Sequence, residues 1–263
     1  LDDAARILEC DRSKISRIES GQRGIRPRDL RDLLTEYGVG TQEQQTLTAI
    51  AHPHRDHGWW RPYTDVLPGT WLEYLITESA ATQIQTYQPQ QIPDLLQTPE
   101  YAHALTAADP ALPPDTQDLF LKAMLTRQQL ILEERKPDLT VVIGEAALHQ
   151  VVGAPKVMRA QLTHLAELTA THPHITLQVL PFATGAHPAS ASGPFTILRF
   201  ADAPSLGVVH LPGPCGGIIL DNPPDVASHA QAFTLLSASA LTPAATTQLL
   251  RDMAARQQAH GRG

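Results

Sequence analysis

Basic and hydroxyl side chains alternate with isoleucines in a short helical pattern near the N-terminus, between residues 11 and 21. Ile15 and Ile18 are three residues apart, so we expect both on the buried face of one helix. The opposite face then carries side chains suited to base edges. Arginine can donate to guanine O6 and N7, and serine can form hydrogen bonds with several bases and discriminates less between them. The residues predicted to contact bases are Arg12, Ser13, Ser16 and Arg17.

The same region carries a concentrated positive charge. Residues 12–31 include seven basic and two acidic residues, a balance of +5 that leaves −12 for the rest of a chain whose total is −7. Such asymmetry indicates that one part of a protein contacts nucleic acid, although a solvated, charged helix face would give the same count. Contacts to DNA phosphates need only basic groups, and we predict them from Lys14, Arg23 and Arg26.

A second set of polar side chains lies in residues 86–98, which are rich in Tyr, Gln and Pro. Such a composition is unsuited to a helix interior. The segment could line a groove for a ligand or a partner protein, with polar contacts from Tyr87, Gln90, Gln91 and Gln97. It could equally be an ordered connector, because proline-rich turns between helices need no ligand to explain them.

A metal site is not expected. His52, His54 and His57 are close in sequence, but Asp56 is the sole cysteine or acidic residue near them. Zinc sites usually combine several such ligands at characteristic spacings, and histidines in a linker are usually solvated. The sequence therefore predicts no bound metal and no cofactor.

Catalysis lacks a motif as well. Glu145, His149 and Asp221 have no spacing that would bring them together, and neither a nucleophile turn nor a phosphate-binding loop is present. We expect a protein without catalytic residues, not an enzyme. Cys10 and Cys215 lie far apart, so a disulfide framework is not expected, and a reducing cytoplasm fits the chain best.

Length and composition indicate a globular protein of two domains. The chain has 263 residues, of which 42% are hydrophobic and 18% charged, and single domains usually have roughly 100 to 200 residues. No apolar run approaches the roughly 20 residues that span a bilayer, and no signal peptide is evident. Membrane insertion and export are therefore disfavoured.

The first domain is predicted to be mainly helical and to cover residues 1–51. Helices are expected at residues 12–19, capped by Asp11, at 27–37 and at 41–51, with a helical pattern already present at Asp2. Because the sequence starts with Leu1 inside that pattern, we expect the first helix of the domain to be missing or truncated. Residues 52–68 break the periodicity and are predicted to form a linker.

The second domain, residues 69–258, is predicted to be α+β with a small sheet. Short β-branched or apolar runs predict strands at residues 139–143, 175–180, 195–200 and 206–211. Helical periodicity predicts helices at residues 71–85, 99–107, 114–134, 155–170, 224–241 and 243–257.

Residues 12–21, Arg-Ser-Lys-Ile-Ser-Arg-Ile-Glu-Ser-Gly, resemble the signature of the XRE (Cro/repressor-type) helix-turn-helix family. Residues 71–256 resemble the C-terminal domain of unknown function in a group of actinobacterial XRE-type regulators. The second resemblance rests on Trp71–Tyr74 with Glu78, Thr86–Thr98 with Tyr101 and Ala102, Glu145–Leu148, and Val179–Phe182. It implies a regulator that is often encoded beside a small, toxin-like partner protein.

The function expected from these features is sequence-specific binding of double-stranded DNA. One recognition helix reads only a few base pairs, so we expect a homodimer on a palindromic operator, with regulation through the second domain. Two alternatives remain: an antitoxin-like protein that sequesters a small partner protein, and a receptor for a small-molecule effector.

Overall fold

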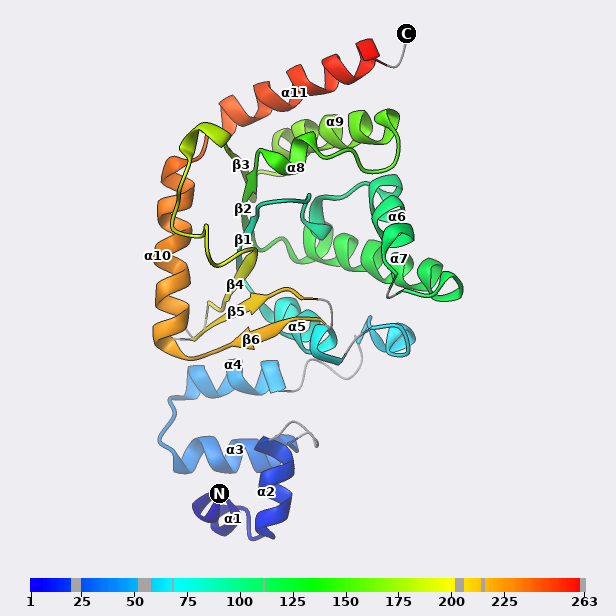
Figure 1. Ribbon diagram of the computed structural model, residues 1–263. Helices are drawn as coiled ribbons and strands as arrows, with labels where there is room; N and C mark the ends of the chain where they lie inside the picture. Colours follow the sequence, from blue (N-terminus) through cyan, green and yellow to red (C-terminus); the bar gives the residue numbers. More distant parts are fainter. Residues whose placement is uncertain are drawn as a thin grey trace. The chain divides into compact units, whose positions relative to one another are not determined.

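The computed structural model divides the chain into two units, Leu1–Gly58 with Phe200–Ser205, and Trp59–Arg199 with Leu206–Gly263 (Figure 1). It describes residues 1–19, 25–51, 58–67, 69–110, 112–201, 206–213 and 216–260. The residues Arg23, His52, His54, Asp56, His57 and Cys215, which the sequence analysis considers, lie outside these ranges.

Helices make up the first unit over its described residues. They are α1 (Asp2–Ile7), α2 (Arg12–Glu19), α3 (Pro27–Glu36) and α4 (Thr41–Ala51). Proline begins α3, where its missing N–H costs no hydrogen bond. Gly38, at a φ of 70°, follows the end of α3 in the left-handed conformation that glycine adopts without strain. The predicted mainly helical N-terminal domain is confirmed.

A mixed six-stranded sheet forms the centre of the second unit, in the order β3-β2-β1-β4-β5-β6 as far as the structure describes it. Strands β1, β2 and β3 run parallel, whereas β4, β5 and β6 pair antiparallel from β1 outward. The strand bounds are β1 (Gln83–Gln88), β2 (Asp138–Gly144), β3 (Ile175–Leu180), β4 (Phe195–Arg199), β5 (Gly207–Leu211) and β6 (Ile218–Leu220).

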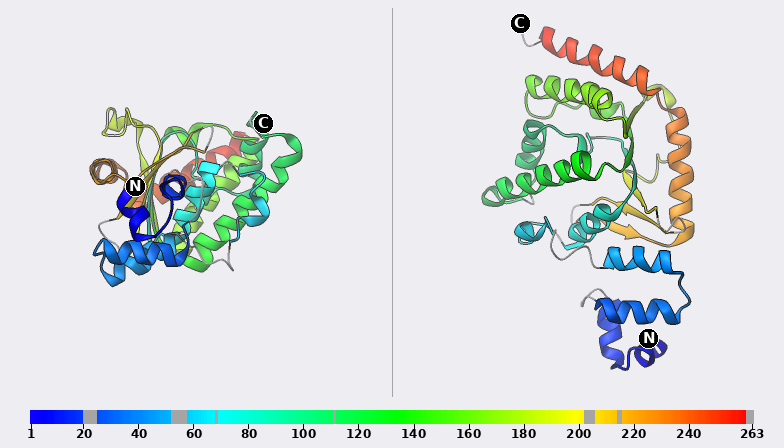
Figure 2. Two further views of the ribbon diagram at one scale, coloured as in Figure 1. Left: turned by 90° about the horizontal axis from the view of Figure 1, so that it is seen from below. Right: turned by 180° about the vertical axis from the view of Figure 1, so that it is seen from behind.

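Helices cover both faces of this sheet (Figure 2). Helix α10 (Pro223–Ser239) lies on one face, and α5 (Gly69–Ala80), α6 (Pro99–Ala108), α7 (Pro114–Gln128) and α9 (Pro155–Thr171) lie on the other. The remaining elements are α8 (Ala146–His149), α11 (Pro243–His260), a π-helix, η3 (Gln129–Arg135), that continues α7, and the short 3-10 helices η1 (Arg61–Tyr63), η2 (Asp94–Leu96) and η4 (Phe182–Thr184). No described helix is both long and apolar enough to cross a bilayer.

The α10 face of the sheet holds a dry core. Phe195 and Ile197 from β4 and Val209 from β5 are fully buried there against Phe233 and Leu236 of α10. Because successive strand residues point to opposite faces, the neighbours Thr196 and His210 point to the other face. That face carries polar side chains and the cavity described below.

The predicted α+β class is confirmed, but two strands were missed and one helix was overextended. Helix α5 ends at Ala80, and residues 83–88, predicted in part as helix and in part as connector, form the central strand β1. The glutamines of β1 are not among the residues enriched in strands, so no strand pattern was evident there. The strand is formed through the pairing of its backbone with β2 and β4. The second unit begins at Trp59, within the range 52–68 that was predicted as a linker, and Tyr63 and Leu67 are buried.

Gly144, at the end of β2, brings two segments of backbone into close contact. A Cβ at this position would lie 2.5 Å from the carbonyl oxygen of Pro89 and 3.0 Å from its Cα. Both neighbours are main chain, so neither can move away without disturbing the chain just after β1.

Replacement of Gly144 by alanine is expected to lower the free energy of unfolding by about 1–3 kcal/mol through overpacking. Urea unfolding followed by circular dichroism measures the loss. Gly69→Ala is the matched control, because a Cβ on Gly69 meets nothing within 4 Å and alanine favours the helix that begins there. Equal stability of the two variants would contradict the close approach.

Candidate functional site

Helix α2 presents one polar face and one apolar face. Ile15 is buried in the first unit, whereas the four residues predicted to contact bases, Arg12, Ser13, Ser16 and Arg17, are all exposed. Asp11 precedes the helix and accepts a hydrogen bond from the Ser13 amide at 2.8 Å. That bond lowers the pKa of Asp11, because it stabilises the carboxylate.

An ion pair fixes α2 to α3. The Lys14 ammonium lies 2.6 Å from Asp29 Oδ2, and the two side chains are only 20% and 16% exposed. Lys14 is therefore already paired with Asp29 within the unit. A DNA phosphate that contacted Lys14 would share the ammonium group with Asp29. Arg12, by contrast, pairs with Asp2 at 3.4 Å where both side chains are largely exposed, a geometry that solvent screens strongly.

Arg26 is the remaining described residue of the predicted phosphate-binding set. It is exposed and immediately precedes α3. Its guanidinium can therefore reach an external partner without disturbing the core of the unit.

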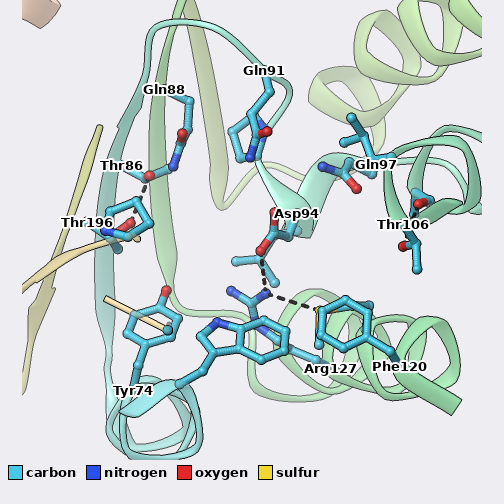
Figure 3. A pocket seen from close by; sticks show the side chains of 18 of the residues that line it. Tyr74, Thr86, Gln88, Gln91, Asp94, Gln97, Thr106, Phe120, Arg127 and Thr196 are labelled. Carbon is cyan, nitrogen blue, oxygen red and sulfur yellow. Dashed lines mark hydrogen bonds and ion pairs between the residues drawn. The ribbon is translucent and has the colours of Figure 1, made fainter. Parts of the chain in front are cut away.

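The second unit contains a cavity of about 810 Å³ on the face of the sheet opposite α10. Polar side chains enter it from β1 and η2, and α5, α6 and α7 supply its apolar walls (Figure 3). Ligand pockets commonly have volumes of roughly 300–1,000 Å³ and combine mostly apolar walls with a few polar groups. The cavity has the size and the lining of a small-molecule site.

A buried ion pair joins two walls of the cavity. Arg127 of α7 donates from Nε and Nη2 to the two carboxylate oxygens of Glu78 on α5, both at 2.7 Å. Its third nitrogen, Nη1, lies 3.3 Å from Asp94 Oδ2 in η2, and the Tyr74 hydroxyl donates to Glu78 Oε1 at 2.5 Å. One guanidinium thus holds α5, α7 and η2 together.

Burial and charge act on this cluster together. Burial opposes the charged form of Arg127, but the attraction of Glu78 outweighs it, and the pKa of Arg127 is raised. Burial, reinforced by the charge of Glu78, raises the pKa of Tyr74 well above its usual value. The guanidinium is therefore charged and the phenol neutral throughout the physiological range.

Aromatic rings form two walls. Trp71 stacks on Phe120 with the ring centroids 5.1 Å apart, and Tyr74 stacks on His210 at 4.1 Å. The His210 Nε2–H donates to the Gly216 carbonyl at 2.7 Å. Burial lowers the pKa of His210, although the hydrogen bond to Gly216 partly opposes the effect, so the ring is neutral near pH 7.

Two glutamines, of which Gln161 is fully buried, fix η2 in place. Gln161 of α9, which is fully buried, donates to the Leu96 carbonyl and accepts from the Thr98 amide, both at 2.7 Å. Gln128 of α7 donates to the carbonyls of Asp94 and Gln97. These bonds satisfy backbone carbonyl and amide groups of residues 94–98 and hold the Asp94 backbone at the cavity.

Comparison with known proteins decides the family. Residues 71–252 match a family described as a domain of unknown function, DUF5753, and the match covers more than half of the 263 residues. The chain belongs to the DUF5753 family. Residues 1–47 match a helix-turn-helix domain, which supports a DNA-binding regulator. No curated protein and no solved structure matches the chain.

In the DUF5753 domain, the four residues predicted to contact a ligand or partner do not all lie at one site. Gln91 and Gln97 line the cavity. Tyr87 points to the α10 face, where its ring contacts Phe195 and its hydroxyl lies 3.3 Å from His187 Nε2. Gln90 is outside the lining of the cavity. Residues 86–98 connect elements, and several of them also line the pocket.

Several residues that line or support the pocket of the DUF5753 domain were missed. Glu78, Asp94, Arg127 and Gln161 had no assigned role, because their partners are distant in sequence. A local signal existed for one contact alone: Tyr74 and Glu78 are four residues apart, a spacing that places two side chains on the same face of a helix.

Two of the residues considered for catalysis lie side by side, with His149 Nε2 3.4 Å from Glu145 Oε1. Glu145 Oε2 accepts a hydrogen bond from the Phe182 amide at 2.8 Å, and His149 packs beside the Phe182 ring. Within the described ranges, no group of three or more His, Cys, Asp or Glu side chains is arranged to hold a metal ion.

Removal of the Arg127 guanidinium is expected to destabilise the DUF5753 domain severely. Arg127→Leu leaves the Glu78 carboxylate buried without its partner, which costs about 3–5 kcal/mol, whereas Glu78→Leu/Arg127→Leu should recover a large part of that loss. Urea unfolding measures both variants. Arg159→Leu, at an exposed position on α9, serves as the control. If the double variant is no more stable than Arg127→Leu, the unpaired charge of Glu78 is not the cause of the lost stability.

The domain is also expected to lose stability in mild acid. The folded pKa of His210 lies below its unfolded value of about 6.5, so the unfolded chain binds more protons at lower pH. The free energy of unfolding should therefore fall as the pH decreases below about 6.5, and His210→Gln should reduce that slope. Urea unfolding across this window tests the expectation, and an unchanged slope in the variant would refute it.

Proposed function

We propose that this chain is a sequence-specific transcriptional regulator of the XRE type that binds double-stranded DNA through α2. The observation that carries the proposal is the exposed face of α2 within a matched helix-turn-helix domain. In this motif the second helix enters the major groove, and its N-terminal side chains meet the base edges. Arg12, Ser13, Ser16 and Arg17 occupy that place here.

We further propose that the regulator acts as a homodimer on a palindromic operator. A helix of eight residues, as α2 is, reaches only a few base pairs, and two half-sites one helical turn apart multiply both affinity and specificity. The DUF5753 domain would regulate DNA binding without catalysing a reaction, and the resemblance to actinobacterial regulators favours a cytoplasmic protein.

The cavity supports a small-molecule effector as the regulatory signal. It is concave, its walls are largely apolar, and a buried ion pair and the hydrogen bonds of two glutamines rigidify it. Such preorganisation reduces the entropic cost of binding a ligand. An effector that binds one conformation of the domain more tightly would shift the DNA-binding equilibrium by its differential affinity.

A small partner protein is the second candidate for the regulatory signal. Val151 and Phe182, which are 57% and 62% exposed, follow the carboxyl ends of the parallel strands β2 and β3. Exposed apolar side chains of this size favour contact with another protein. Light scattering of the full chain mixed with each small protein encoded beside its gene tests this candidate, and unchanged masses would exclude it.

Arg17→Ala is expected to weaken binding to the preferred operator by about 1–3 kcal/mol and to relax the preference at one base position. The operator is first selected from a random duplex library with the full wild-type chain, and fluorescence anisotropy then compares the variants on it. Wild-type affinity should fall steeply with increasing salt, because phosphate contacts release counterions.

Arg251→Ala provides the matched control, because Arg251 is exposed on α11, far along the chain from α2. Uniform weakening of Arg17→Ala on all sequences would assign Arg17 to phosphate instead of bases. Failure of the wild-type chain to select any sequence would refute the regulator itself.

A further inference from the structure

The charge around the cavity is unbalanced. Glu78, Asp94 and Arg127 form one connected cluster with two negative charges and one positive charge. Arg127 is the sole lysine or arginine among the described residues that line the cavity, and the lowered pKa of His210 keeps that ring neutral near pH 7. A ligand entering the cavity therefore meets a net negative charge.

Asp94 is the member of the cluster that can accept a ligand. Its side chain is 41% exposed, whereas those of Glu78 and Arg127 are at most 5% exposed. Its Oδ2 contacts Arg127, and Oδ1 has no hydrogen-bond partner among the described residues. The glutamine bonds to η2 hold its backbone, so this oxygen is preorganised and costs little entropy on binding.

Arg127 is not available to an anion. Two of its nitrogens donate to Glu78 at 2.7 Å, and the third lies beside Asp94. A carboxylate or phosphate in the cavity would have to displace one of these partners, and the displaced carboxylate would stay desolvated beside the new charge. The cavity therefore disfavours anionic ligands despite its arginine.

The rest of the cavity suits an apolar body with a few hydrogen-bonding groups. The stacked pair of Trp71 and Phe120 forms one wall, and the side-chain amides of Gln88, Gln91 and Gln97 lie along the opposite side (Figure 3). The same figure shows Asp94 between Gln91 and Gln97 on one side and Arg127 on the other. Aromatic walls also attract cations through their ring faces.

We propose that this cavity binds a small organic cation, a protonated amine on an aromatic or apolar body, with the ammonium group donating to Asp94 Oδ1. The aromatic body packs against Trp71 and Phe120, and Gln91 and Gln97 contact polar substituents. Such a cation would be the effector of the regulator proposed above, and its role as an effector rests on that proposed function.

The test compares matched pairs of probes that share a ring and a two-carbon chain but differ in charge. Tryptamine is compared with indole-3-propionate, and phenethylamine with 3-phenylpropionate, up to about 10 mM, a range suited to ligands of this small size. Saturation-transfer NMR and calorimetry on the full wild-type chain give the affinities. Each amine is expected to bind about tenfold or more tightly than its carboxylate, the effect of one charge-assisted hydrogen bond.

The variant Asp94→Asn removes the charge and keeps the shape. It should weaken amine binding about tenfold, whereas Asp118→Asn, at an exposed position on α7 outside the cavity lining, should leave it unchanged. The thermal midpoint of each variant is measured alongside. If Asp94→Asn does not fold, the comparison of amine with carboxylate on the wild-type chain still decides.

Equal or tighter binding of the carboxylates, no binding of either amine, or unchanged amine binding by a folded Asp94→Asn variant would each overturn the proposal. DNA binding of the same preparations separates the two hypotheses. A chain that selects an operator but binds no amine refutes the cation site alone. A chain that binds amines at Asp94 but selects no DNA refutes the regulator and leaves the cation site standing.

Discussion

The two short hydrogen bonds between Arg127 and Glu78 organise the pocket of the second unit. They connect α5 to α7 across the cavity, and the third nitrogen of the same guanidinium reaches Asp94 in η2. An unpaired charge at this depth would be too costly to retain, so the three elements are held in one arrangement. The cavity is consequently a preformed feature, and its net negative charge follows from the pairing of one arginine with two carboxylates.

The two units use charge in opposite ways. On α2 the arginines are exposed, and the close Lys14–Asp29 pair serves to join two helices. Exposed cations lose little hydration until a polyanion approaches, and binding then gains from counterion release. In the DUF5753 domain Arg127 and Glu78 are buried and paired with each other. The first arrangement suits a large, highly charged partner and the second a small ligand selected by shape and by the excess negative charge of the cluster.

Sequence patterns were sufficient wherever the structure is locally determined. Helix α2 has the predicted bounds, because Asp11 caps it and Ile15 gives it a buried side. The apolar, β-branched runs at β2 and β3 were recognisable because these strands are buried on both faces. Strand β1 escaped, because three of its six residues are glutamines, and the three-residue β6 gives hardly any pattern.

The sequence by itself determined the helix-turn-helix, its basic face and the α+β class of the second domain, because capping, periodicity and local charge act over a few residues. Tertiary structure alone decided which polar residues share a site. Glu78 and Arg127 are 49 residues apart and Gln161 and Leu96 are 65 apart, separations at which neither period nor motif connects two side chains. Which face each strand residue occupies also depended on the pairing of the sheet, and for this reason Thr86 and Gln88 reach the cavity whereas Tyr87 between them faces the core under α10.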